Sequence, residues 1–462
     1  MNPASRSLAM ALVCLYAAPT AHSAASAPGA ATPFAPALLN SISELDTIKA
    51  RIASGAEPWK SAYQKAFSSK LAATGYVATA RDTVACGSYS NPDYGCSDES
   101  NDSKAAYTQA LLWRFTGDTA YAARAAAILD AWSAVLKAHT LSNAPLQAGW
   151  TASVFVRAAV ILRATYPAWG VGAQARFAAM LDSAFLPLIR KGNPTTNGNW
   201  ELTYTEAMMA IGVFNADTAA FNKGVFLWRK RVPAYFYLKS DGPLPTKPYG
   251  VPVNYSDSQL VVHWYAPQVW PDGLCQETCR DFGHTQMGLA AMIDAAEIAL
   301  HQGLDLYSES ADRIIAAMEF HAGLLLGGTP PPGLCGDSLN LSMGATWEIA
   351  YNHFHNRMGR SLPLTDRLIR EKIRPSGTGT HMAWESLTHG ELGALRPDAV
   401  RPKARRAPAR GALLILLGTG LAWTREGKAY GLNGKRMPVA ASPSGAETAG
   451  AAGSRAITTS TP

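Results

Sequence analysis

The sequence predicts an all-α fold in which consecutive helices pair into hairpins. Apolar residues recur at helical spacing through most of residues 40–392, and Gly, Pro and Asn separate these segments as loops. Few stretches show the period of two that a half-buried strand requires. Serial helical hairpins can close into an α/α toroid or stack into a solenoid. Because no repeat of fixed length is present, the pattern favours the toroid.

Residues 1–23 have the layout of a secretory signal. Arg6 supplies one positive charge, residues 8–18 are apolar, and small residues surround a cleavage position near Ser23. The apolar stretch is too short to span a bilayer, so we expect a cleaved leader and no stable membrane insertion. We therefore expect a periplasmic or secreted protein, with residues 24–39 as a linker.

Helical periodicity within the domain at 40–392 is interrupted by two longer loops, at residues 81–103 and 238–275. Long loops in a compact domain are often functional. The clearest helical segments are 105–116, 120–136, 152–165, 174–189 and 311–326.

Five cysteines remain after Cys14 leaves with the leader. In an oxidising compartment, Cys86 and Cys96 are expected to close a loop rich in Gly, Asn and Pro. Cys275 and Cys279 are four residues apart, so a bond between them on one helix would be strained, and one of them pairing with Cys335 is the alternative. No second metal-type pair accompanies them, so we expect structural thiols and no metal.

The formal net charge of +7 belongs to the C-terminal end of the chain. Residues 393–462 carry eleven Lys/Arg and three Asp/Glu, a net of +8, and Arg6 adds one more, which leaves −2 for residues 24–392. The basic charge therefore gives no reason to expect a nucleic-acid partner for the domain. Residues 393–462 form a basic, low-complexity tail whose composition is typical of disorder.

The first polar segment beside an apolar helix is Asn197-Gly-Asn-Trp-Glu201. Asn199 is a good N-cap for a helix over residues 200–214, because its side chain can accept a first-turn amide hydrogen bond. The alternative is that an amide at the helix start, next to Trp200, contacts a substrate carboxylate.

The second segment runs from Asp272 into an apolar helix at residues 287–300. If the helix begins at Glu277, then Glu277, Arg280 and His284 share one face, together with Asp281. A solvated ion-pair face is one interpretation. A functional site is the other, because this face gathers Arg, His and carboxyl groups after a loop.

The third segment, residues 346–357, contains Tyr351 on an apolar stripe. Tyr351 is either a core residue with its hydroxyl hydrogen-bonded or a functional phenol. His353 and His355 lie two residues apart, which on a helix points them away from each other and disfavours a metal pair. A further polar cluster of weaker meaning comprises His381, Glu385 and His389.

The residue types in these segments suit β-elimination from a uronic acid. The sequence contains no phosphate-binding loop, nucleophile elbow, zinc-protease motif or dinucleotide fingerprint. Removing the C5 proton of a uronate places a second charge on its carboxylate. Such a reaction needs a donor to the carboxylate, a base, and an acid for the leaving O4, and Asn, Arg, His and Tyr can supply all three.

Several long strings resemble the alginate lyase domain superfamily, in the branch containing alginate and glucuronan lyases. They are NGNWELTYTEAMMAIGVF, RVPAYFYLKSDGPLP, DGLCQETCRDFGHTQMGLAAM and TWEIAYNHFHNRMG followed by GTGTHMAWESLTHG. The resemblance covers roughly residues 40–392 and implies an incomplete α/α toroid with a central cleft. It also implies an anionic polysaccharide partner (alginate or glucuronan) and metal-independent elimination to unsaturated oligouronates without a cofactor.

The resemblance assigns roles position by position. Asn199, with Asn197 as the alternative, corresponds to the amide that contacts the carboxylate, and His284 to the base or its partner. Tyr351 corresponds to the tyrosine that acts as the acid, and it is also the alternative to His284 as the base. The segment Asn-Gly-Asn-Trp-Glu departs from the Asn-Asn-His segment of better-known members, which leaves the choice of asparagine and of substrate open. The predicted catalytic residues are His284, Tyr351, Asn199 and Arg280, and the predicted substrate-binding residues are Asn197, Trp200, Glu277, His353 and Arg357.

Two other functions remain as alternatives. A glycoside hydrolase on a similar toroid would use two carboxyl groups, such as Glu277 with Asp281 or Glu201, placed across the scissile bond. A non-catalytic periplasmic protein on the same scaffold would bind oligouronates without turnover.

Overall fold

The structure, a computed structural model, describes residues 34–393 and two short strands in the tail, β4 (Ala422–Trp423) and β5 (Ala429–Tyr430). The two strands pair antiparallel within a unit of their own, residues 404–462. The predicted leader, most of the predicted linker and most of the predicted tail lie outside the described residues. Those assignments stay predictions.

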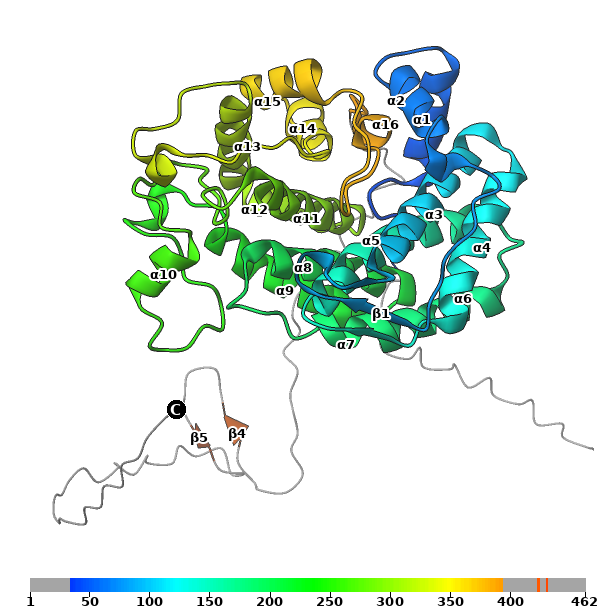
Figure 1. Ribbon diagram of the computed structural model, residues 1–462, viewed down its shortest axis with the longest axis horizontal. Coiled ribbons are helices and arrows are strands. Elements are labelled where there is room, and N and C mark those ends of the chain that lie inside the picture. The colour runs from blue at the N-terminus through cyan, green and yellow to red at the C-terminus, as the bar shows by residue number, and fades with distance from the viewer. Residues whose placement is uncertain (1–33, 394–421, 424–428, 431–462) are drawn as a thin grey trace, which may run out of the picture. The chain divides into compact units, whose positions relative to one another are not determined.

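Four long helices form the inner layer of the domain (Figure 1). They are α3 (Cys96–Thr116), α5 (Ala144–Thr165), α8 (Gly198–Asn215) and α11 (Phe282–His301), and each packs on the next. The intervening segments form shorter outer helices. These are α4 (Thr119–Val135), α6 (Val171–Met180), α7 (Leu186–Ile189), α9 (Thr218–Arg231), α12 (Leu306–Glu309) and α13 (Ala311–Leu325). The predicted all-α toroid of helical hairpins is confirmed.

Small residues set the close packing of neighbouring helices. A Cβ atom added at Gly212 on α8 would lie 2.7 Å from the backbone nitrogen of Phe221, and one at Gly224 on α9 would lie 2.6 Å from Met209. Glycine at both positions therefore lets α8 and α9 approach closely. Helix α5 is apolar on nearly all sides, as expected for a helix covered all round. It is long and apolar enough to cross a membrane, but 89% of its most apolar 18-residue window is buried inside the domain, so it is a core helix.

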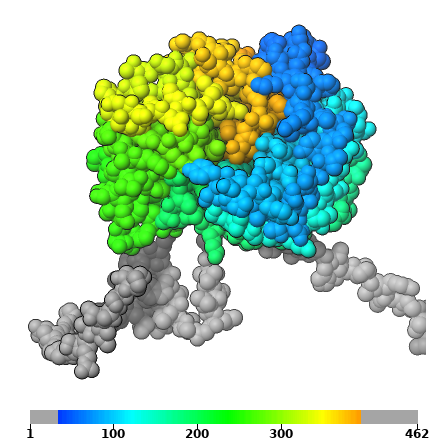
Figure 2. All heavy atoms as spheres, viewed as in Figure 1, coloured from blue at the N-terminus to red at the C-terminus, as the bar shows by residue number. Residues whose placement is uncertain are grey.

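The two ends of the domain are in contact with each other. Helix α11 contacts α14 (Glu348–Tyr351), α14 contacts α16 (Glu385–His389), and α16 contacts α1 (Ile42–Ala53), which returns to α3. In Figure 2 the blue N-terminal helices accordingly lie beside the orange C-terminal segment. The other helices are α2 (Trp59–Phe67), α10 (Asp257–His263) and α15 (Pro363–Leu368), with π-helical turns at Leu181–Phe185, Asn352–Arg357 and Ile369–Ile373 and short 3-10 turns at Lys70–Ala72, Ser88–Ser90, Val232–Ala234, Lys239–Asp241 and Leu334–Asp337.

A small sheet fastens the loop before α3. Strand β1 (Thr83–Cys86) pairs antiparallel with β2 (Asp93–Tyr94) and parallel with β3 (Ala138–Thr140). The predicted disulfide Cys86–Cys96 is present in this loop. A second disulfide joins Cys279 to Cys335, and Cys275 is a buried thiol, which resolves the alternatives left open by the spacing.

Candidate active site

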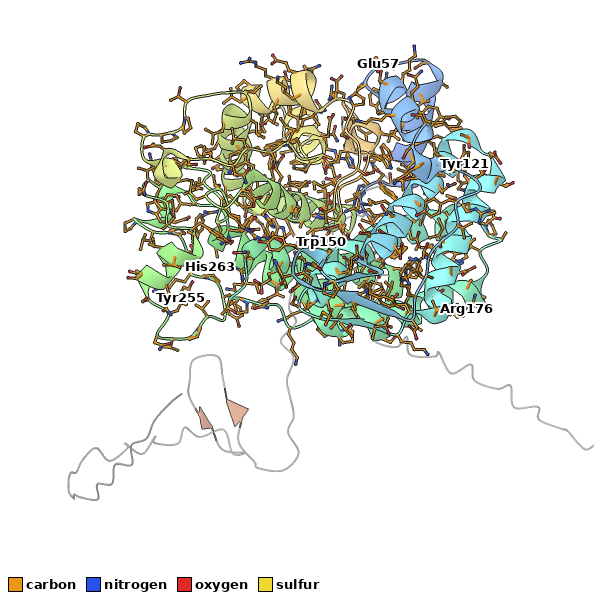
Figure 3. All side chains as sticks on the ribbon, in the orientation of Figure 1. Glu57, Tyr121, Trp150, Arg176, Tyr255 and His263 are labelled. Carbon is orange, nitrogen blue, oxygen red and sulfur yellow. A yellow bond between two sulfur atoms is a disulfide. The ribbon has the colours of Figure 1, made fainter. Side chains whose placement is uncertain are left out.

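A cavity of about 880 Å³ opens among α3, α5 and the first turns of α8 and α11. The 3-10 turn Ser88–Ser90 and residues 379–380 close its sides. Trp150, near the centre of the view in Figure 3, contributes an aromatic wall from α5. The side chains most relevant to chemistry are those of Tyr89, Asn101, Lys104, Gln147, Asn197, Trp200, Arg280 and His284.

The charges of this cavity have one sign. Among the described residues that line it, Lys104 and Arg280 are the cations, and none is Asp or Glu. The Lys104 ammonium is partly buried and donates to the carbonyl oxygen of Gly379 at 3.3 Å. Burial, followed by the nearby charge of Lys70, lowers the pKa of Lys104. The cavity is therefore suited to an anionic ligand.

His284 is held in one orientation by the residue that starts its helix. Helix α11 begins at Phe282, so the condition of a helix from Glu277 is not met, and Glu277 and Arg280 precede the helix that carries His284. Asp281 is its N-cap and accepts from the backbone N–H of His284 at 2.8 Å. The ring Nδ1 of His284 lies 2.7 Å from Asp281 Oδ2. A proton on Nδ1 leaves Nε2 with a free lone pair, the form required of a base.

Glu277 lies beneath the cavity and supports it. Its carboxylate is fully buried and accepts hydrogen bonds from Arg280 Nη1 (2.8 Å), Tyr235 (2.8 Å) and Asn199 Nδ2 (2.7 and 2.8 Å). Burial disfavours the charge of Arg280, but Glu277 together with Tyr89 and Tyr265 more than offsets this, and the pKa of Arg280 is raised. The prediction that Glu277 binds substrate is corrected: it orients Arg280, which lines the cavity.

Tyr235 fixes the spacing between the two helix starts that carry these groups. A Cβ atom added at Gly198 of α8 would lie 2.1 Å from its ring, and one at Gly288 of α11 would lie 2.2 Å from its hydroxyl oxygen. The phenol therefore fits only between two glycines. Its hydroxyl reaches the Glu277 carboxylate from this position.

The amide that faces the cavity belongs to Asn197, and Asn199 lies below it. Helix α8 begins at Gly198, with Asn197 at the N-cap, so Asn199 is a buried residue of the first turn and not the predicted cap. The side-chain oxygen of Asn197 accepts from Tyr265 and Gln276, each at 3.2 Å. Its amide nitrogen has no partner among the described residues and is free to donate to a ligand.

Tyr89 is a cavity residue that the sequence did not reveal. Arg280 Nη2 donates to its hydroxyl at 3.3 Å, and its side chain is 81% exposed. Tyr89 and Ser90 adopt φ angles of 53° and 54°, the left-handed region that non-glycine residues rarely occupy. Such backbone strain is often found at functional sites. The one available signal was that Tyr89 lies in the cysteine-bracketed loop.

Tyr351 does not reach the cavity. Its side chain is 1% exposed, its hydroxyl donates to Asp366 at 2.5 Å, and its ring stacks on His355. Burial, then the hydrogen bond to Asp366, raises its pKa. Tyr351 is therefore the core tyrosine with a hydrogen-bonded hydroxyl, and the prediction that it is a catalytic residue beside His284 is corrected.

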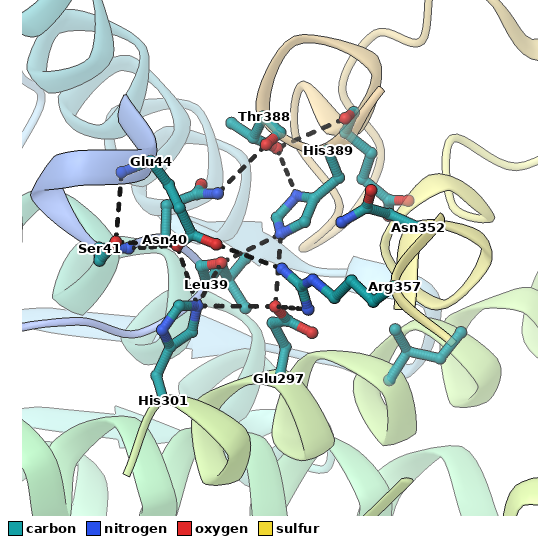
Figure 4. A network of polar contacts seen from close by, with 12 residues as sticks. Leu39, Asn40, Ser41, Glu44, Glu297, His301, Asn352, Arg357, Thr388 and His389 are labelled. Atoms are coloured by element: carbon teal, nitrogen blue, oxygen red, sulfur yellow. Dashed lines mark hydrogen bonds and ion pairs between the residues drawn. The ribbon is translucent and has the colours of Figure 1, made fainter. Parts of the chain in front are cut away.

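His353 and Arg357 are structural as well. His353 is 3% exposed and stacks on Tyr307 at a centroid distance of 4.0 Å. Arg357 donates to Glu297 at 2.8 Å and to Glu44 at 3.3 Å in the buried network of Figure 4. This network ties α1 and α11 to the C-terminal segment. Neither residue lines the cavity, so their predicted contact with substrate is corrected.

The toroid and its cation-lined cleft define a polysaccharide lyase. The family model for alginate lyase matches residues 87–327. That match covers more than half of the chain, and the chain belongs to the alginate lyase family.

Solved structures with the same fold include two of alginate lyase A1-III from Sphingomonas species A1. A tyrosine-to-phenylalanine variant complexed with tetrasaccharide is 17% identical, with 79% of this chain and 99% of that chain covered and a TM-score of 0.51. A histidine-to-alanine variant in its apo form is 16% identical, with 78% and 98% covered and a TM-score of 0.52. At this identity the likeness shows the shared toroid. No curated protein matches the chain.

Proposed function

We propose that the protein cleaves a uronic-acid polymer, alginate or glucuronan, by β-elimination in the cavity around Arg280 and His284. The single observation that carries the proposal is the composition of the cavity. It presents two cations, a free amide, an imidazole and a phenol, and its described lining has no carboxylate. Those are the groups that an elimination from an acidic sugar requires.

Arg280 and Asn197 are assigned to the sugar carboxylate. Loss of the C5 proton makes this group doubly charged, so donors that strengthen as charge develops lower the barrier. Glu277 positions the Arg280 guanidinium, and Tyr265 with Gln276 hold the oxygen of Asn197 so that its nitrogen faces outward. One such donor contributes roughly 10²–10³-fold to rate.

His284 is assigned as the base and Tyr89 as the acid. The C5 proton passes to His284 Nε2, the electron pair forms the C4–C5 double bond, and the C4–O4 bond breaks. Tyr89 gives its proton to O4. Because Arg280 donates to the Tyr89 oxygen, the phenol proton is left for another acceptor. Each step is assigned to a side chain, so the proposed elimination is metal-independent and yields unsaturated oligouronates.

The arrangement of carboxyl groups disfavours the hydrolase alternative. Glu277 is bound by Arg280, and Asp281 by His284. Glu201 is buried and pairs with Arg231 at 2.6 Å. A glycosidase needs two carboxyl groups across the scissile bond, and these three lie behind the cavity lining.

Absorbance and reducing ends measured together test the proposal. The protein is incubated with alginate, glucuronan and a neutral polysaccharide. We expect far-ultraviolet absorbance and the number of reducing ends to rise in parallel on at least one uronate polymer. Neither signal should rise with the neutral polysaccharide. Reducing ends without absorbance would indicate hydrolysis, and binding without either signal would indicate a non-catalytic protein.

We also propose a periplasmic or secreted location. Its support is the leader-like residues 1–23 and the two disulfides, which persist in oxidising compartments. Cell fractionation with detection of the chain after residue 40 tests this. Recovery in the cytoplasm with reduced cysteines would contradict it.

A further inference from the structure

Four charged or polar side chains from distant parts of the chain meet in the core, outside the cavity lining. Arg157 comes from α5, Glu206 from α8, Asp294 from α11, and His381 from the segment before α16. Each is at most 3% exposed. Figure 1 shows this C-terminal segment, in orange, reaching down to the inner helices.

Arg157 binds one face of this group and leaves the other face open. Its Nη2 donates to Glu206 Oε1 at 2.6 Å and to Asp294 Oδ2 at 2.7 Å, and its Nη1 donates to the carbonyl oxygen of His381 at 3.1 Å. The second oxygens, Glu206 Oε2 and Asp294 Oδ1, have no partner among the described residues, and neither ring nitrogen of His381 has one.

The unsatisfied atoms lie together. His381 Nε2 is 3.7 Å from Glu206 Oε2, and one ligand atom from each of Glu206, Asp294 and His381 lies within 4.8 Å of the others. A buried polar atom without a partner is costly. Several such atoms around one point indicate that something binds there.

The charge balance favours a cation. Arg157 supplies one positive charge against two carboxylates. The second carboxylate oxygens, Glu206 Oε2 and Asp294 Oδ1, receive no hydrogen bond from Arg157. A neutral imidazole offers a nitrogen lone pair, so His381 can act as a ligand.

We propose that Glu206, Asp294 and His381 form a buried structural site for a divalent transition-metal ion of the zinc type. An imidazole with two carboxylates suits Zn²⁺ better than Ca²⁺ or Mg²⁺, which prefer oxygen ligands alone. Tetrahedral Zn²⁺ places its ligand atoms roughly 3.4 Å apart, so a small contraction of the cluster accommodates it. Arg157 holds the outer carboxylate oxygens, the usual support of a metal ligand.

The ion would fix one wall of the cavity. Gly379 and Thr380 line the cavity, and His381 follows them directly in the chain. Thr378 and Ala383 form an isolated bridge that makes this segment a tight turn. A metal bound to His381 therefore ties the turn to α8 and α11. The ion takes no part in the proposed elimination, so this inference stands apart from the proposed function.

Metal analysis of the full chain tests the site. The protein is refolded with ZnCl₂, freed of loosely bound metal, and assayed by elemental analysis and thermal unfolding. We expect about one equivalent of zinc per chain and a melting temperature a few degrees above that of protein refolded with a chelator. His381→Gln is expected to lose the metal and the shift. His321→Gln, at another fully buried histidine, is the matched control and is expected to keep both.

Two outcomes would overturn the proposal. The first is that wild-type protein refolded with ZnCl₂ holds no zinc and shows no shift in melting temperature. The cluster would then be satisfied by a water molecule or a shared proton. Retention of a full equivalent by His381→Gln would place the metal elsewhere. If His381→Gln fails to fold, the wild-type comparison with and without zinc still decides.

Discussion

Asp281 holds His284 at two points, through the backbone N–H at 2.8 Å and through ring Nδ1 at 2.7 Å. One carboxylate therefore starts helix α11 and sets the tautomer of the proposed base. This coupling explains why a polar run at the beginning of an apolar helix can be both a cap and a catalytic element.

Asp281→Asn separates these two roles. Asparagine is also a good N-cap, so the helix start is kept, but its amide can donate to Nδ1 and shift the proton to Nε2. We expect kcat to fall about 10²–10⁴-fold with little loss of stability, measured by initial absorbance rates and thermal unfolding. Asp305→Asn, at the cap of α12, is the control and should leave kcat unchanged. Near-normal turnover of Asp281→Asn would remove Asp281 from the mechanism.

Tyr89→Phe tests the proposed acid. The substitution removes the hydroxyl next to Arg280 and keeps the ring, so we expect kcat to fall by about 10²-fold or more with a smaller change in KM. Tyr94→Phe, an exposed tyrosine in the same loop that is absent from the cavity lining, is the matched control. Equal rates for the two variants would show that another group protonates O4.

Tyr351→Phe is expected to keep its activity, in contrast to Tyr89→Phe. The hydroxyl of Tyr351 is bound to Asp366 away from the cavity, so we expect kcat/KM within about threefold of wild type. Loss of this hydrogen bond should lower the free energy of unfolding by about 1 kcal/mol, as measured in urea. A large loss of activity in a stable Tyr351→Phe protein would restore the role that the family resemblance implied.

The buried histidines predict how stability depends on pH. Burial lowers the pKa of His321 to about 4, whereas the unfolded value is about 6.5. Below pH 6.5 the unfolded chain therefore binds a proton that the folded chain does not. The free energy of unfolding should fall by about 1.4 kcal/mol per pH unit from this residue as the pH drops from 6 to about 4. His321→Gln should make the measured decline less steep by that amount.

His139 should act with the opposite sign. Burial lowers its pKa, but Glu99 together with the carbonyl oxygen of Ala184 more than offsets this, and the folded pKa is raised. Its stabilisation is therefore fully present below the unfolded pKa and is lost as the pH rises through the folded pKa. His139→Gln should therefore leave the slope between pH 6 and 4 unchanged, and should remove the part of the stability that the wild type loses as the pH rises above about 6.5. A less steep acid-side decline in His139→Gln would contradict this assignment.

The helices could be predicted from the sequence because the buried face of a helix places apolar residues at regular intervals along the chain. Segments such as 105–116 and 152–165 lie within α3 and α5, whose apolar residues form the core. Arg280 and His284 were predicted to lie together for a similar reason, since they flank the start of a helix with a clear apolar stripe, and both line the cavity. Their catalytic roles stay a prediction.

The spacing of residues along the sequence was not sufficient where a shift of one or two residues, or a contact with a distant segment, determines which side chain faces the cavity. Helix α8 begins two residues before the predicted start, which moved Asn199 into the core and Asn197 to the cavity. Tyr89 reaches the site through a left-handed turn in a disulfide-closed loop, and no periodicity encodes that. Tyr351 fitted a core stripe and a catalytic role equally well, and only its partner Asp366 distinguishes them.

The most direct test of the account is the initial rate of far-ultraviolet absorbance with His284→Ala on whichever uronate polymer the wild type cleaves. Removal of the proposed base should lower kcat by at least about 10²–10⁴-fold, while melting temperature and oligouronate binding stay close to wild type. A folded His284→Ala protein that eliminates within tenfold of the wild-type rate would contradict the assignment of this cavity as the active site.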